Sequence, residues 1–130
     1  MNANAGRLPV LLGWINIGLG VALFLGYWVY LPMPQVFMAG DRADPGLILY
    51  ALATAGAAFV AWGILLRGVQ AGGISRALIF KASAAGFAML GLMRLGTALF
   101  PHGPFEQMLA LPVVESAVFV LLAVRLYQSA

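Results

Sequence analysis

Two ionisable residues of opposite charge, Arg94 and Glu115, lie inside long apolar stretches of the sequence. An ionisable group within a membrane span costs roughly 2.5–3.5 kcal/mol on insertion scales, so such groups pair with one another or mark a functional site. A pair of this kind can fix the register of two helices or bind the polar group of a lipophilic ligand. Glu115 could also serve as a general acid or base within the bilayer. These alternatives stay open at the level of sequence.

Other polar residues interrupt the apolar stretches, and each shares a helical face with small or polar neighbours. Because polar groups are costly against lipid, these faces should meet in the interior of the protein. Close packing could complete such a polar interior, or a small amphiphile could bind in it. The candidate ligand-binding residues are Arg94, Glu115, Asn16, Tyr27, Thr54 and Thr97.

The composition excludes several kinds of chemistry. The chain of 130 residues has no cysteine and a single histidine, His102. Thiol catalysis, cysteine-ligated zinc, iron–sulfur clusters and sites with several histidines are therefore excluded. No nucleophile–base pair is visible, so we expect no catalytic residue, no metal and no cofactor. The seven basic residues do not form a patch interleaved with aromatics, which argues against a nucleic-acid partner.

The balance of residue types predicts an integral membrane protein. Hydrophobic residues make up 63% of the chain and charged residues 8%, whereas soluble domains carry about 25% charge. Four apolar stretches exceed or approach the ~20 helical residues that cross a bilayer, and the short connections between them favour antiparallel neighbours. We expect an all-α, up-down-up-down four-helix bundle, forming one transmembrane domain over residues 1–130. The predicted spans are about 8–31, 46–66, 77–100 and 105–124.

The predicted spans place the two charged residues on facing helices. Arg94 lies about 9 Å from the end of the third span, and Glu115 about 15 Å from the start of the fourth. Side chains on a helix lean toward its N-terminus, so the two residues should lean toward each other and could form an ion pair. The alternative is that each residue has a separate partner. Pro112, within the predicted fourth span, should free the carbonyl of Met108. A kink there would open space beside Glu115, although prolines in membrane helices are also tolerated without any function.

The basic residues predict an orientation in the membrane. Five of them lie at one end of the spans, whereas only Arg42, beside Asp41 and Asp44, lies at the other. Because cytoplasmic loops carry an excess of Lys and Arg, both termini should be cytoplasmic, and we expect a bacterial cytoplasmic (inner) membrane. The five residues at the predicted cytoplasmic end are Arg7, Arg67, Arg76, Lys81 and Arg125.

The layout resembles small bacterial four-helix membrane proteins of the DoxX-like group. The segments that carry this resemblance are LYA at 49–51, WGILL at 62–66 and SRAL at 75–78, together with Arg94 and Glu115. The resemblance implies a four-helix fold and its topology, and it implies that an arginine and an acid recur within the spans. It implies little about activity.

Two functions of different kinds fit these features. The first is a non-enzymatic accessory or interaction subunit of a larger membrane complex, or a homo-oligomer, because the loops are minimal and stripes of small residues permit close helix approach. The alternative is a binder or carrier of a small lipophilic molecule (a quinone, isoprenoid or lipid) in a polar interior around Arg94 and Glu115. An enzyme that uses Glu115 is a third hypothesis. In each case the lipid bilayer is the first partner.

Overall fold

The computed structural model describes residues 7–37, 44–69 and 72–130, and the regular elements in these ranges are helical. Four helices are long and apolar enough to cross a membrane, as the sequence predicts. Two short helical elements lie in the connections between them. The elements are α1 (Arg7–Tyr30), α2 (Pro34–Phe37), α3 (Pro45–Gly68), α4 (Arg76–Leu99), the 3₁₀ helix η2 (Gly103–Glu106) and α5 (Ala110–Gln128).

The first three predicted spans agree with the structure to within two residues, but the predicted start of the fourth is wrong. The chain forms the 3₁₀ helix η2 where the fourth span was expected to begin, and α5 begins only at Ala110. Pro112 therefore lies in the first turn of α5, where a backbone N–H has no helical acceptor in any case. The carbonyl of Met108 accepts a hydrogen bond from the Leu111 N–H (3.1 Å). The Met108 carbonyl is therefore not left free, and Pro112 does not interrupt α5.

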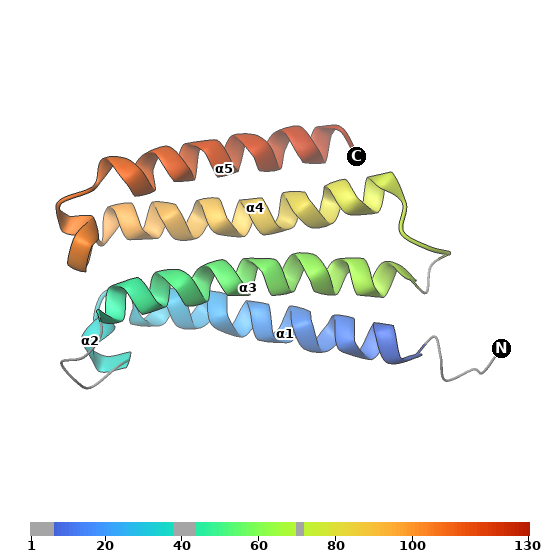
Figure 1. Ribbon diagram of the computed structural model, residues 1–130, viewed down its shortest axis with the longest axis horizontal. Coiled ribbons are helices and arrows are strands. Elements are labelled where there is room, and N and C mark those ends of the chain that lie inside the picture. The colour runs from blue at the N-terminus through green and yellow to red at the C-terminus, as the bar shows by residue number, and fades with distance from the viewer. Residues whose placement is uncertain (1–6, 38–43, 70–71) are drawn as a thin grey trace.

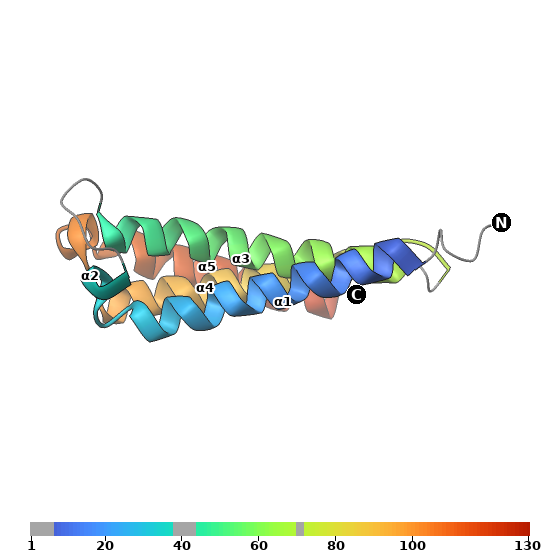
Figure 2. The same cartoon turned by 90° about the horizontal axis from the view of Figure 1, so that it is seen from below.

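Successive long helices run in opposite directions, and the start of α1 lies at the same end of the molecule as the end of α5 (Figure 1). Helix α3 packs against both α1 and α4, whereas α5 packs against α4. Viewed from below, α1 and α3 lie side by side in front of the α4–α5 pair (Figure 2). Within the described residues, the helices thus form two antiparallel pairs joined through α3 and α4.

Four glycines bring α1 and α3 into backbone contact. Gly13 and Gly20 on α1 are seven residues apart, as are Gly56 and Gly63 on α3. A Cβ added to Gly20 would lie 2.5 Å from the Gly56 carbonyl oxygen, and one added to Gly63 would lie 2.6 Å from the Gly13 carbonyl oxygen. Such close approach maximises van der Waals contact where lipid offers no hydrophobic driving force. We refer to these four residues as the glycine seam.

The hydrophobic core lies where α1, α3 and α4 meet, toward the end opposite the termini. Phe24, Trp28 and Met89 pack around it. Tyr27 continues the seven-residue spacing of the glycine seam on α1, and Leu49 continues it on α3. The seam therefore leads into the core, whose buried residues are Tyr27, Leu31, Leu49, Ala53 and Met93.

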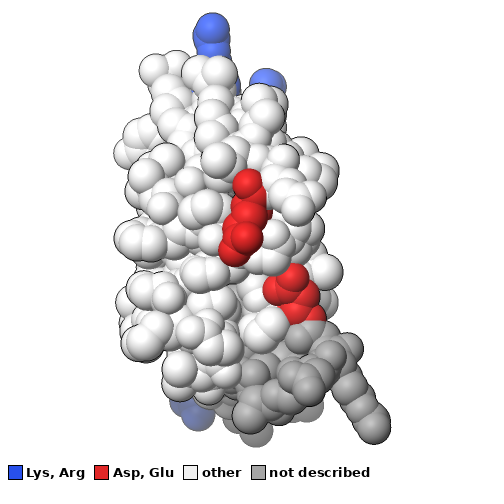
Figure 3. Space-filling view, turned by 90° about the vertical axis from the view of Figure 1, so that its left-hand side faces the viewer, with Lys and Arg blue, Asp and Glu red and all other residues white. Residues whose placement is uncertain are grey.

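The connection between α4 and α5 rests on the start of α3. The Asp44 carboxylate caps α3 by accepting hydrogen bonds from the N–H groups of Gly46 (2.9 Å) and Leu47 (3.2 Å). Gly103 has a positive φ of 59°, and any side chain there would collide with Asp44. Acidic side chains lie on this end of the molecule, with basic ones only at the margins of the view (Figure 3). Asp41 and Arg42, which the sequence places at this end, lie outside the described residues.

The glycine seam predicts a strong position dependence for glycine substitutions in α1. We expect Gly20→Ala to lower the free energy of unfolding in detergent by about 1–3 kcal/mol, because the added methyl meets the backbone of α3. Gly18→Ala is the matched control, since no atom lies within 4 Å of its added Cβ. It should be neutral or stabilising by up to ~1 kcal/mol through helix propensity. Thermal unfolding followed by circular dichroism measures both, and equal effects would contradict the seam.

Candidate functional site

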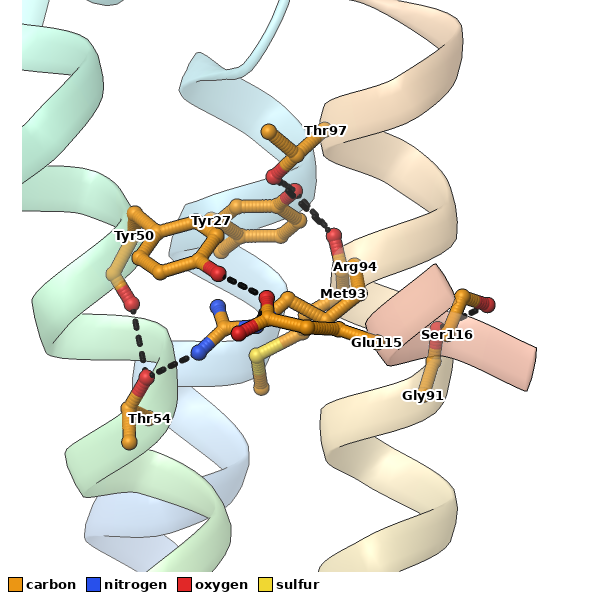
Figure 4. Close-up of polar contacts among 9 residues, drawn as sticks. All are labelled: Tyr27, Tyr50, Thr54, Gly91, Met93, Arg94, Thr97, Glu115 and Ser116. Carbon is orange, nitrogen blue, oxygen red and sulfur yellow. Dashed lines mark hydrogen bonds and ion pairs between the residues drawn. The ribbon is translucent and has the colours of Figure 1, made fainter. Parts of the chain in front are cut away.

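Arg94 is the centre of a polar network that joins three helices (Figure 4). Its side chain is buried, with 5% exposed, and its Nε lies 3.1 Å from Oε2 of Glu115 on α5. Its Nη2 donates a hydrogen bond to the Thr54 hydroxyl on α3 (2.8 Å). The guanidinium carbon also lies 3.3 Å from the centre of the Tyr50 ring, within the range of a cation–π contact. The ion pair expected from the sequence is thus present in the structure.

The revised start of α5 changes the depth of this pair. Glu115 is five residues from the start of α5, and Arg94 is five residues from the end of α4. Each therefore lies about 7.5 Å from the same end of the helix pair. The two side chains therefore meet at nearly the same depth. Neither has to extend along the helix axis to reach the other, as the predicted boundaries required. The polar network consequently lies close to the connections at that end of the helices.

Tyr50 belongs to this network although it was not among the predicted binding residues. Its hydroxyl donates a hydrogen bond to the Glu115 carboxylate, and its backbone carbonyl accepts one from the Thr54 hydroxyl (3.0 Å). Its ring stacks on Phe105 of η2, with the ring centres 4.6 Å apart. Tyr50 lies one helical turn before Thr54 on the same face of the helix. This spacing is the sequence signal that could have placed Tyr50 beside Thr54 in the network.

Tyr27 and Thr97 form a separate polar contact between α1 and α4. The Tyr27 hydroxyl donates to the backbone carbonyl of Met93 and lies 2.6 Å from the Thr97 hydroxyl. Thr97 in turn bonds the same carbonyl at 3.2 Å. Both side chains are almost fully buried. Their bonding groups are used within the protein, so they position α1 against α4 and leave no free group facing a groove.

Asn16 does not join either polar cluster. It is half-buried on α1 and lies eleven residues before Tyr27, which corresponds to about 16 Å along the helix. Asn16 therefore lies at a different depth from the other candidate residues. Sharing a helical face aligns residues around the axis but not along it, and that is why periodicity alone does not give the depth of Asn16.

The Arg94 guanidinium keeps an unused hydrogen-bond donor. Its Nη1 is buried and has no hydrogen-bond partner within the described residues, and its Nε faces Glu115 without hydrogen-bond geometry. Leaving a buried polar group unsatisfied costs about 1–3 kcal/mol, more when the group is charged. Such a group in a well-packed region calls for a partner. A hydrogen-bond acceptor from a ligand would supply one.

An apolar groove between α3 and α4 begins beside this network. It has a volume of about 270 Å³, and Thr54, the acceptor of the Arg94 hydrogen bond, forms part of its wall. The space stays open because half of the lining residues are alanine or glycine, which have little or no side chain. A second hydroxyl, that of Ser83, lies on the α4 side. Among the described residues, His, Asp and Glu form no group of three that could bind a metal. The groove is lined by Thr54, Ala57, Ala58, Ala61, Ser83, Gly86, Phe87 and Leu90.

The ion pair predicts energetic coupling between α4 and α5. We expect Arg94→Met and Glu115→Gln to be non-additive, with a coupling energy of about 0.5–3 kcal/mol in a double-mutant cycle. The reason is that each single substitution leaves the other group without its partner. Unfolding in detergent measures the free energy of unfolding of the wild type, the two single variants and the double variant. Arg125→Gln paired with Glu115→Gln is the control, because Arg125 is exposed at the far end of α5. Additive effects for Arg94 and Glu115 would contradict the coupling.

Comparison with models of protein families, with curated proteins and with solved structures found no match to this chain. The resemblance to the DoxX-like group therefore stays a prediction from short segments. The candidate site has to be interpreted from its own geometry. A threonine hydroxyl in the wall of an apolar groove accepts a hydrogen bond from a buried guanidinium, which in turn faces a tyrosine–carboxylate contact.

Proposed function

We propose that this protein binds or carries a small lipophilic molecule between α3 and α4. The observation that carries the proposal is the position of Thr54, which accepts the hydrogen bond from Arg94 and also lines the apolar groove. A ligand lying in the groove would therefore meet the Thr54 hydroxyl, small apolar residues along its length and the Ser83 hydroxyl on α4. Ligand pockets commonly combine a mostly apolar lining with a few placed polar groups.

The charges of the site favour a neutral polar group on the ligand. Glu115 compensates the charge of Arg94 at 3.1 Å, so an anionic ligand is not required for charge balance. The unused Nη1 donor instead suits a carbonyl or hydroxyl oxygen. The Thr54 hydroxyl already donates its proton to the Tyr50 carbonyl, so toward a ligand it can act only as an acceptor. A quinone fits this description, as does an isoprenoid or lipid that ends in such a group. At about 270 Å³ the groove suits one ring or a short segment of chain.

A role as an accessory or interaction subunit is the second candidate. It is supported by α1, which is the least buried of the four long helices and has α3 as its main neighbour. Much of the α1 surface is therefore available to a helix of a larger membrane complex or to a second copy of this chain. The two candidates are compatible, because the groove lies on the opposite side of α3 from its contact with α1.

We further propose that both termini are cytoplasmic and that the membrane is the bacterial inner membrane. Arg7, Arg76 and Arg125 lie at the end that carries the termini, and Asp44 and Glu106 lie at the other. This distribution supports the orientation through the excess of basic residues in cytoplasmic connections.

Ligand binding is tested with a short-tailed quinone, decylubiquinone, and the protein in mild detergent. We expect Ala58→Phe, which fills the groove, to weaken binding at least tenfold. We expect Thr54→Val to weaken it by about twofold to tenfold, because the Arg94 guanidinium loses the hydroxyl that holds it beside the groove. Ala51→Phe is the matched control, because Ala51 is also exposed on α3 but does not line the groove. Titration by native mass spectrometry measures the occupancy.

Equal binding by the wild type and Ala58→Phe would contradict the proposed site. The same spectra, recorded directly after gentle extraction, separate the two candidate functions. A small co-purified species lost on Ala58→Phe supports the ligand carrier. A bound second protein, with no small species and no quinone binding, supports the accessory subunit.

The orientation is tested by labelling single cysteines, because the chain has none of its own. A membrane-impermeant maleimide should label Gln107→Cys in intact spheroplasts and Ser129→Cys only after permeabilisation. Both positions are exposed, at opposite ends of α5. The reverse pattern would show that the termini face outward.

A further inference from the structure

A second groove lies between α4 and α5, at the end of the molecule that carries the termini. Its volume is about 480 Å³, larger than that of the groove beside Thr54. It is separate from that groove, because it uses α5 in place of α3 and none of its lining residues is shared. The lining residues are Lys81, Ala84, Ala85, Ala88, Ala123, Val124, Tyr127 and Gln128.

The lining changes from polar to apolar along the groove. Lys81 is in the second turn of α4, while Tyr127 and Gln128 are at the end of α5, so these three polar groups lie nearest the membrane surface. From Lys81 to Ala88 the groove extends about 10 Å toward the middle of the span. Along that distance alanines on both helices leave a shallow channel with methyl walls. The polar end of the groove thus matches the headgroup of a lipid, and its apolar length matches an acyl chain.

The charge at the mouth of the groove is positive and uncompensated. Lys81 is exposed and takes part in no ion pair or hydrogen bond within the described residues. Arg76 begins the same helix, and Arg125 is in the last turn of α5. The described acidic residues lie in the opposite half of the molecule, toward η2. An anionic group is therefore the complement of this surface.

We propose that this groove binds one anionic phospholipid. The Lys81 ammonium group forms an ion pair with the phosphate of the lipid. The Tyr127 hydroxyl and the Gln128 amide form hydrogen bonds with the headgroup. One acyl chain lies on Ala84, Ala88 and the other small residues. A second copy of the chain is the poorer occupant, because a symmetric contact through this groove would bring the Lys81 and Arg125 residues of both copies together. This site is independent of the proposed ligand between α3 and α4.

Native mass spectrometry of the protein released from nanodiscs tests the proposal. The nanodiscs contain equal amounts of palmitoyl-oleoyl phosphatidylglycerol and palmitoyl-oleoyl phosphatidylcholine. We expect the wild type to retain one phosphatidylglycerol in preference to phosphatidylcholine. Lys81→Gln should lower that preference about fivefold, the effect of one basic side chain at an anionic membrane surface. Ala84→Leu should lower retention of both lipids by blocking the channel.

Two matched control variants distinguish lipid binding in the groove from nonspecific attraction of anionic lipids to the basic end of the molecule. Arg7→Gln removes one charge at the same end of the molecule, and Ala117→Leu adds the same bulk at an exposed position of α5 outside the groove. Both should retain phosphatidylglycerol as the wild type does, and all variants should show the helical circular dichroism of the wild type. Equal losses for Lys81→Gln and Arg7→Gln, or unchanged retention in Ala84→Leu, would overturn the proposal. A lipid-free dimer abolished by Ala84→Leu would overturn it in favour of self-association.

Discussion

The cost of holding a guanidinium inside an apolar span is the constraint on which the half of this molecule nearest η2 depends. Arg94 is buried, and it is compensated by groups from two other helices: the Glu115 carboxylate of α5, and the Thr54 hydroxyl and Tyr50 ring of α3. No one of these contacts uses all the donors of the guanidinium. The three helices must therefore hold a common register at this depth, since a shift of one turn would leave the charge without its partners.

The second constraint is steric and acts between α1 and α3. The glycine seam brings the two backbones together with no room for a methyl group, and the same seven-residue spacing continues to Tyr27 and Leu49 in the core. Tyr27 then bonds the backbone of α4 at Met93. The α1–α3 pair and the α4–α5 pair are thus joined by a hydrogen bond from α1 and by the ion-pair network from α3. Rigid placement of α3 against α4 in this way is what forms and preserves the groove beside Thr54.

The two grooves differ in the way their polar groups are used. Beside Thr54, opposite charges neutralise each other within the protein, and the remaining capacity is for hydrogen bonds. At the other end of the molecule, Lys81 has no acidic neighbour among the described residues, and the remaining capacity is for negative charge. The two grooves of this chain therefore differ in the chemistry that their polar groups present.

The sequence by itself determined the class of the protein, the four apolar helices and the pairing of Arg94 with Glu115. These features follow from local composition, from helix length against bilayer thickness, and from the high cost of an unpaired charge in an apolar span. Only the tertiary structure decided where α5 begins, because η2 occupies the residues before it. The helix η2 is held in place by the stacking of the Phe105 ring on Tyr50 and by the close fit of Gly103 against Asp44. The tertiary structure also decided that Tyr50 joins the site, that Asn16 stays outside it, and that glycines on different helices face each other. Periodicity describes angles around one helix axis, whereas these outcomes depend on the relative height and approach of two helices, which is set by side-chain packing between them.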